Sequence, residues 1–123
     1  MENTILAIDD EPEVLNLIQF SLERAGFKVQ TCDNGRHAWD ALQKSKPDLL
    51  VLDVMLPGID GYSLMLKISQ EQSTKDIPII VLTALEPSRT LFQKFSQVAG
   101  FMTKPFKTDE LVEKVRSTLS IKK

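Results

Sequence analysis

Two short runs of continuous apolar residues constrain the fold of this chain more than any other feature of its sequence. Residues 48–53 (Asp-Leu-Leu-Val-Leu-Asp) and 77–82 (Ile-Pro-Ile-Ile-Val-Leu) show no alternation between apolar and polar positions. Strands of this kind are typical of the centre of a parallel sheet, where helices cover both faces. The two runs therefore predict an α/β fold with a doubly wound sheet.

Weaker strand patterns and amphipathic helical patterns alternate with these two runs. Further strands are predicted at 4–8, 27–32 and 99–103, and helices at 12–25, 38–42, 62–68, 87–98 and 111–119. Five parallel strands alternating with five helices favour the flavodoxin-like strand order 2-1-3-4-5. We expect residues 1–123 to form one domain.

Length and composition exclude several classes of protein. The chain has 123 residues, of which 42% are hydrophobic and 26% charged, as in a globular domain. Its longest apolar stretch, residues 77–85, is about half of what a membrane span needs, and the first residues lack the basic region of a signal peptide. The lone Cys32 can form no internal disulfide. These features predict a cytoplasmic protein with no membrane contact.

The charge pattern favours a cation as ligand over nucleic acid. The formal net charge is −2, with the acidic residues concentrated in the first half of the chain and no dense basic run anywhere. Direct nucleic-acid binding through neutralised phosphates is therefore not expected. The glycine-rich loops that bind nucleotide phosphates are also missing, which disfavours a nucleotide-dependent enzyme.

Polar residues follow four of the five predicted strands. Asp9 and Asp10 come after the first strand, Asp53 ends the third, and Thr83 and Lys104 follow the fourth and fifth. Parallel strands end at one edge of a sheet, so these side chains converge there. Each has a simpler alternative: Asp10 as a helix cap, Thr83 as a turn hydroxyl, Lys104 as a solvated lysine. Asp53 is harder to dismiss, because it ends the most apolar strand.

Three carboxylates gathered at one edge repel one another unless a cation joins them. Like charges about 4 Å apart repel by roughly 4 kcal/mol at an effective dielectric constant of 20. Oxygen ligands suit Mg²⁺, whereas Cys32 and His37 lie in the wrong region to supply zinc ligands. Beside Mg²⁺ and Lys104, the Asp53 carboxylate is placed to attack a phosphoryl group. The residues alone thus predict a magnesium-dependent aspartate phosphorylation site.

The chain resembles the response regulator receiver domains of bacterial two-component systems, of the single-domain type, over essentially its whole length. Four blocks carry the resemblance: residues 8–11 (Ile-Asp-Asp-Glu), 52–61 (Leu-Asp-Val-Met-Leu-Pro-Gly-Ile-Asp-Gly), 83–84 (Thr-Ala) and 103–106 (Thr-Lys-Pro-Phe). The block from Asp53 to Gly61 is very specific. Its combination with the acidic pair and the Lys-Pro dipeptide is hard to obtain by chance.

The resemblance implies a phosphoprotein that works as a switch in a phosphorelay. Asp53 is expected to accept a phosphoryl group from a sensor histidine kinase or a phosphotransfer protein. Asp10, Asp53 and the backbone carbonyl of Met55 are expected to bind Mg²⁺ directly, and Asp9 through water. Such a protein takes part in its own phosphorylation and dephosphorylation but is not an enzyme.

The same resemblance assigns roles to residues around the phosphoryl group. Lys104, the Thr83 hydroxyl and the backbone N–H of Ala84 are expected to contact it. Thr83 and Phe101 form the expected switch, although Phe101 lacks the hydroxyl of the tyrosine often found there. Pro105 is expected to support the loop through a cis turn.

Output is expected through protein–protein contacts on the face of helix four, strand five and helix five if the chain, which stops soon after its last helix, is a complete regulator. The alternative is a receiver excised from a longer regulator. Phosphorylation-driven homodimerisation is one form of such contact. By helical spacing Leu91, Phe95 and Val98 share a stripe that leaves out Phe92. Phe92 is therefore assigned either to this partner surface or to packing against a neighbouring helix. The stretch 97–101 also departs from the Gly-Ala-Asp-Asp-Tyr type run common in the family.

Three rival functions use a similar fold. A haloacid-dehalogenase-type phosphohydrolase needs a second aspartate two residues after its nucleophile, where this chain has Met55. A flavodoxin binds a flavin phosphate after its first strand, where the acidic residues 9–11 would repel it. A receiver-like scaffold that is never phosphorylated would not need the complete set of site residues.

Overall fold

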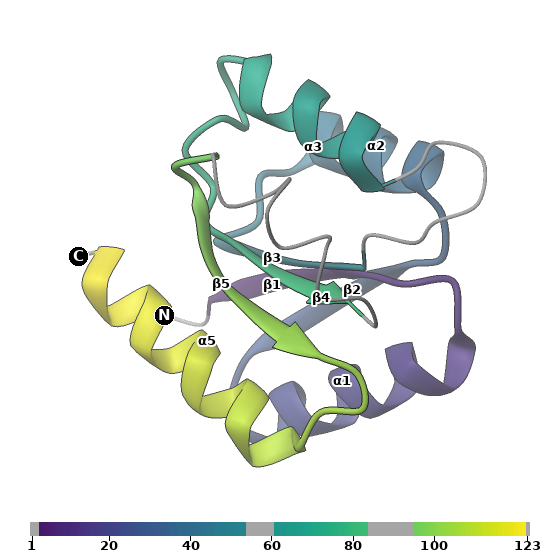
Figure 1. Ribbon diagram of the computed structural model, residues 1–123, viewed down its shortest axis with the longest axis vertical. Coiled ribbons are helices and arrows are strands. Elements are labelled where there is room, and N and C mark those ends of the chain that lie inside the picture. The colour runs from purple at the N-terminus through teal and green to yellow at the C-terminus, as the bar shows by residue number, and fades with distance from the viewer. Residues whose placement is uncertain (1–2, 54–60, 84–94, 123) are drawn as a thin grey trace.

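The structure, a computed structural model, describes residues 3–53, 61–83 and 95–122, and it contains one five-stranded parallel sheet (Figure 1). The strands are β1 (Thr4–Ile8), β2 (Lys28–Cys32), β3 (Leu49–Asp53), β4 (Ile79–Thr83) and β5 (Val98–Thr103). Their order is β2-β1-β3-β4-β5, and every neighbouring pair is parallel. The α/β fold and the strand order predicted from the sequence are confirmed.

Helices cover both faces of this sheet. The described helices are α1 (Pro12–Arg24), α2 (Gly35–Lys44), α3 (Gly61–Gln70) and α5 (Thr108–Lys122). Figure 1 shows α2 and α3 on one face and α1 and α5 on the other. Residues 84–94, which hold most of the helix predicted at 87–98, lie outside the described residues. None of the described helices is both long enough and apolar enough to cross a membrane.

Side chains of the central strands alternate between two apolar clusters, one on each face. In β3, Leu50 and Leu52 pack with α2 and α3, whereas Leu49 and Val51 pack with α1 and α5. Every residue of β3 is buried as a result. Burial on both faces is the physical reason why residues 48–53 carry no polar alternation.

The register of the sheet brings the strand ends to one edge. Ile8 lies opposite Leu52 in the β1–β3 pair, and Thr83 lies opposite Thr103 in the β4–β5 pair. The residues that follow β1, end β3 and follow β5 are therefore neighbours in space. We call this side of the sheet the carboxyl edge.

The prediction of a helix through residue 98 is wrong in the part that the structure describes. Residues 95–97 form a turn, and Val98 begins β5. The Gln97 side chain donates hydrogen bonds to the backbone carbonyls of Thr74 (3.2 Å) and Ile77 (2.8 Å). These long-range bonds tie the chain to the turn before β4, and helical spacing in the sequence carries no sign of them.

The fourth strand also begins later than predicted. It starts at Ile79, because Ile77 belongs to the preceding turn, where its N–H donates to the Thr74 carbonyl. Pro78 has no N–H to offer the sheet, although its carbonyl accepts from Leu50 at 3.0 Å. The buried side chain of Ile77 still joins the core, so its apolar character reports burial and not strand pairing.

Candidate metal site at the carboxyl edge of the sheet

Two buried aspartates extend neighbouring strands at the carboxyl edge. Asp9 follows β1, where its N–H continues the ladder by donating to the Cys32 carbonyl at 3.1 Å, and Asp53 is the last residue of β3. Their side chains are 0% and 4% exposed. Buried carboxylates are costly unless paired or bound to a cation, so this arrangement calls for positive charge.

A third carboxylate completes a group that fits a metal ion. Asp10 is exposed, and one oxygen each from Asp9, Asp10 and Asp53 can lie within 4.8 Å of the others. The buried Oδ2 of Asp9 makes an ion pair with Lys104 but accepts no hydrogen bond of regular geometry from the described residues. A buried oxygen with spare acceptor capacity, in a set of oxygen donors, fits a hard cation such as Mg²⁺.

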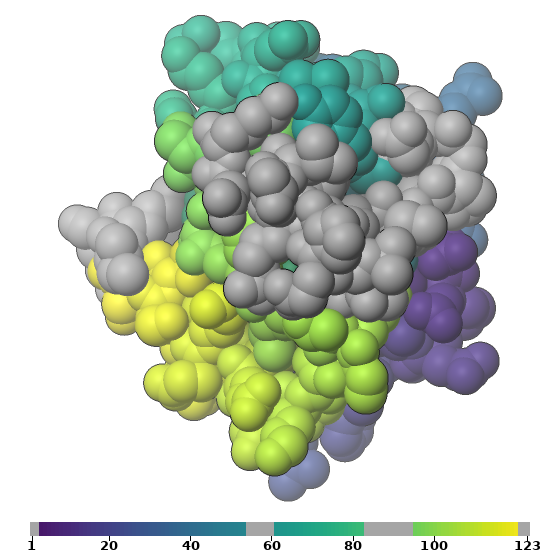
Figure 2. Space-filling model, in the orientation of Figure 1, coloured from purple at the N-terminus to yellow at the C-terminus, as the bar shows by residue number. Residues whose placement is uncertain are grey.

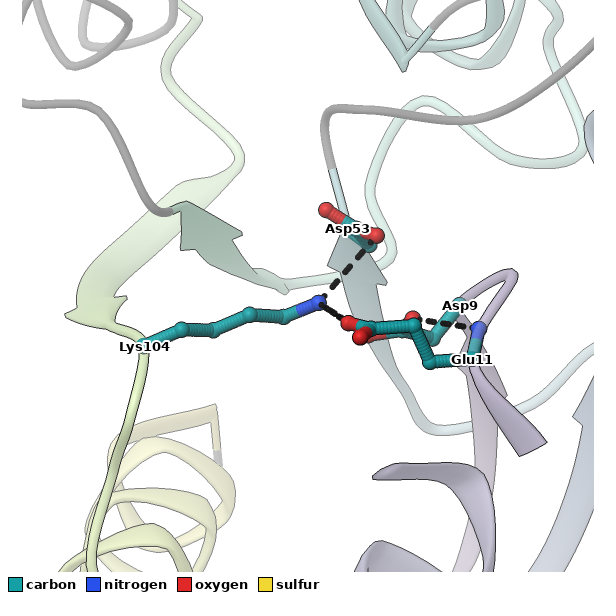
Figure 3. Close-up of polar contacts among 4 residues, drawn as sticks. All are labelled: Asp9, Glu11, Asp53 and Lys104. Atoms are coloured by element: carbon teal, nitrogen blue, oxygen red, sulfur yellow. Dashed lines mark hydrogen bonds and ion pairs between the residues drawn. The ribbon is translucent and has the colours of Figure 1, made fainter. Parts of the chain in front are cut away.

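Lys104 supplies the positive charge from the opposite side of the site. It follows β5, and its side chain reaches across the carboxyl edge toward β1 and β3 (Figure 3). Its Nζ atom lies 2.8 Å from Asp9 Oδ2, 2.9 Å from Glu11 Oε1 and 3.3 Å from Asp53 Oδ2. The lysine side chain is only 16% exposed. One ammonium therefore touches three carboxylates.

The carboxylates keep Lys104 protonated. Burial alone would lower the pKa of its ammonium, because desolvation disfavours the charged form. Contacts with Asp9 and Glu11, together with the negative charge of Asp53, outweigh burial and raise the pKa above its ordinary value. The lysine is thus a permanent cation at any physiological pH.

The remaining predicted site residues are placed to different extents. Phe101 lies in β5, half-buried, and packs against the α2–α3 side of the core. Thr83 is the last residue of β4, and the Lys104–Pro105 peptide bond is cis. The predictions for Met55, Ala84 and Phe92 fall outside the described residues.

One member of this site received no role from the sequence. Glu11 stands directly after the aspartate pair and is the N-cap residue of α1, which leaves its side chain free to turn toward Lys104. Its N–H donates to Asp9 Oδ1 at 2.9 Å, so Asp9 also orders the start of the helix. The alternative that made Asp10 the cap of this helix is wrong. The only sequence signal for a role of Glu11 in the site was its position directly after Asp9 and Asp10.

Chemically, this edge combines buried carboxylates, a lysine ammonium and a set of oxygen atoms that fits a divalent metal. Such a set suits the transfer of a phosphoryl group, whose oxygens need charge neutralisation and whose phosphorus needs an aligned nucleophile. The described residues at this edge include no histidine or thiol side chain among the clustered ligands. The described ligands therefore suit a metal ion that prefers oxygen donors.

Comparison with known proteins gives a consistent picture. The family model described as response regulator receiver domain matches residues 5–116. The chain is 37% identical over 116 residues to the DNA-binding dual master transcriptional regulator RpaA of Synechocystis sp., a match that covers 94% of this chain and 48% of RpaA. The chain spans about half the length of the curated relatives it matches.

Solved structures with a similar fold cover nearly all of this chain. A candidate response regulator from Chloroflexus aurantiacus has a TM-score of 0.91 and 33% identity, covering 98% of this chain and 99% of the other. The receiver domain of the sensor histidine kinase PA1611 from Pseudomonas aeruginosa has a TM-score of 0.88 and 27% identity, covering 98% and 99%. That structure holds a magnesium ion coordinated in its active site cleft. With its carboxyl-edge aspartates and lysine, this chain belongs to the response regulator receiver domain family.

Proposed function

We propose that Asp53 accepts a phosphoryl group from the phosphohistidine of a sensor histidine kinase or a phosphotransfer protein. The observation that carries this proposal is the buried Asp53 carboxylate beside Asp9, with Lys104 Nζ at 3.3 Å. In the transfer, an Asp53 oxygen bonds to phosphorus while the bond from phosphorus to the histidine nitrogen breaks. The imidazole leaves with the electron pair, and the product is an aspartyl phosphate.

The other residues of the edge position and neutralise the phosphoryl group. Lys104 pairs with one of its oxygens, a role that its raised pKa supports because the ammonium keeps its charge. Asp9, Asp10 and Asp53 are the residues that would hold Mg²⁺, and the ion found in the PA1611 receiver domain supports this choice. When bound, the metal supplies charge neutralisation for the phosphoryl oxygens.

The signal leaves through protein–protein contacts beside β5 and α5, including phosphorylation-driven pairing of two copies. Figure 2 shows the atoms of α5 next to those of β5 and the segment after it. A groove here is lined by residues that include Phe101, Lys107, Glu110 and Lys114. Thr83 and Phe101 are the switch residues in this proposal. To shift the ratio of their two arrangements from 1:99 to 99:1, the phosphoryl group must interact with the favoured arrangement more strongly by about 5.5 kcal/mol.

The direct test is the intact mass of the protein after incubation with Mg²⁺ and acetyl phosphate. We expect one phosphoryl group on the wild-type chain, none after addition of EDTA before the donor, and none on Asp53→Ala. The matched control is Asp76→Asn, because Asp76 is exposed and remote from the carboxyl edge. It should be phosphorylated like the wild type.

Two outcomes would count against the proposal. Phosphorylation of Asp53→Ala to the wild-type level would place the acceptor elsewhere. Absence of any adduct on the wild type, together with failure to bind beryllofluoride in the presence of Mg²⁺, would leave an unphosphorylated scaffold as the function. A beryllofluoride complex without an acetyl phosphate adduct would instead show a competent site that requires its own kinase.

A further inference from the structure

Glu11 is a charged partner of Lys104 that belongs neither to the phosphoacceptor nor to the aspartate group. Its Oε1 atom lies 2.9 Å from Lys104 Nζ, as close as the buried Asp9 oxygen at 2.8 Å. Its side chain is nevertheless 59% exposed, whereas that of Asp53 is 4% exposed. Figure 3 shows the Glu11 and Asp9 carboxylates side by side at the tip of the lysine.

Three carboxylates of the described residues surround the Lys104 ammonium. Its Nζ donates hydrogen bonds to Glu11 Oε1 (2.9 Å) and Asp53 Oδ2 (3.3 Å), whereas Asp9 Oδ2 lies 2.8 Å away as an ion pair without regular hydrogen-bond geometry. A phosphoryl oxygen that pairs with Lys104 competes with these carboxylates for the ammonium. The contact with Glu11 costs least to break, because water can solvate an exposed carboxylate and cannot reach the two buried ones.

We propose that Glu11 is a displaceable counter-ion of Lys104 that restrains phosphorylation of Asp53. In the resting protein it accepts one hydrogen bond from Lys104 and so competes with a phosphoryl oxygen for the ammonium. It also brings the four carboxylates and one ammonium of the edge to a formal charge of −3, which repels an incoming anion. The inference rests on the proposed function, since it assigns regulation to the same site.

The variant Glu11→Gln tests this role through two effects of opposite sign. It keeps the length of the side chain and the backbone N–H that binds Asp9, but removes the charge. At saturating Mg²⁺, the rate of phosphorylation by acetyl phosphate should rise about two- to fivefold, the range of an exposed ion pair. The affinity for Mg²⁺ alone, measured by calorimetry, should fall by roughly the same factor or less, because one negative charge is lost.

The control is Glu13→Gln, which removes an exposed carboxylate from the same first turn of α1. If Glu11 acts only by adding negative charge near the start of α1, Glu11→Gln and Glu13→Gln will change the phosphorylation rate and the Mg²⁺ affinity equally. We expect Glu13→Gln to leave the phosphorylation rate within about 1.5-fold of the wild type. Melting temperatures of both variants verify that the fold is unchanged.

Three results decide the inference. A faster Glu11→Gln with weaker Mg²⁺ binding supports it. An unchanged or slower Glu11→Gln, with the wild type still phosphorylated on Asp53, overturns it and leaves the proposed function standing. Absence of both a phosphoryl adduct and a beryllofluoride complex in the wild type removes the proposed function itself, and the role of Glu11 with it.

Discussion

Replacement of Asp53 by asparagine should stabilise the metal-free protein while abolishing phosphorylation. Asp53 is 4% exposed and lies between a cation, Lys104, and two like charges, Asp9 and Asp10. Asparagine keeps the shape of the side chain and an oxygen that can accept from Lys104. The change therefore removes one negative charge from a buried cluster at little cost in packing.

The magnitude follows from the distances. Attraction between Asp53 and Lys104 at 3.3 Å is about 5 kcal/mol at an effective dielectric constant of 20. Repulsion from Asp9 within 4.8 Å is about 3.5 kcal/mol, and that from the exposed Asp10, reduced by solvent, is roughly 1 kcal/mol. Among the described residues these terms nearly cancel, so the cost of burying the carboxylate decides the sign. A buried ion costs several kcal/mol, and an amide less, which leaves a gain of about 2 kcal/mol for the variant.

Urea unfolding followed by circular dichroism, in EDTA, measures this difference. Asp76→Asn, an exposed change of the same type, should stay within about 0.5 kcal/mol of the wild type. Added Mg²⁺ should reverse the order. At one hundred times its dissociation constant it stabilises the wild type by about 2.7 kcal/mol, and it should do less for a variant that lacks one carboxylate ligand. An Asp53→Asn protein less stable than wild type in EDTA would refute the reasoning, because attraction by Lys104 would then outweigh the cost of burial.

Two further predictions concern residues outside the carboxylate group. Gln97→Ala should destabilise the fold by about 1–2 kcal/mol in urea unfolding, since the backbone carbonyls of Thr74 and Ile77 lose their donor; Gln72→Ala, on the exposed turn, is the control. Burial, and secondarily the charge of Asp33, raises the pKa of the Cys32 thiol, so iodoacetamide at pH 8 should alkylate it more slowly than in the urea-unfolded chain. The pKa of the Cys32 thiol is about 8.5 in the unfolded chain and higher in the folded protein. Below the unfolded pKa the thiol is neutral and contributes fully to the free energy of unfolding, and this contribution is lost as pH rises through the folded pKa. Equal alkylation rates in the folded and unfolded chains would contradict the burial argument.

The sheet could be predicted from the sequence because its strands are buried on both faces. Alternate residues of β3 enter different apolar clusters, so both odd and even positions must be apolar. The resulting apolar run is visible in the sequence alone. The helices α1 and α5 were equally visible, since each buries one stripe of side chains. Local periodicity is a reliable guide wherever burial is imposed by the element itself.

Periodicity failed where a contact distant in sequence decides the conformation. Phe95 and Val98 stand at helical spacing, yet they have different partners. The Phe95 ring packs edge-on against the Tyr62 ring, with 5.9 Å between the ring centroids, and Val98 pairs with Ile79 in the sheet. The turn between them is held by the side chain of Gln97, bonded to residues about twenty positions earlier. A window of ten residues contains none of these partners, so no reading of local pattern could have found the turn.

The site could be predicted because it places charged residues at strand positions where the sheet favours apolar ones. Asp9 and Asp53 continue the register of β1 and β3, in positions where apolar residues would add to the core. Their burial destabilises the fold unless Lys104 and a cation offset it. The same imbalance gives a divalent metal ion a free-energy advantage on binding, because the ion offsets the excess negative charge. Glu11 was not predicted, because an exposed glutamate after the aspartate pair is not distinctive in the sequence. Its part in the site depends on its contact with Lys104, which only the geometry reveals.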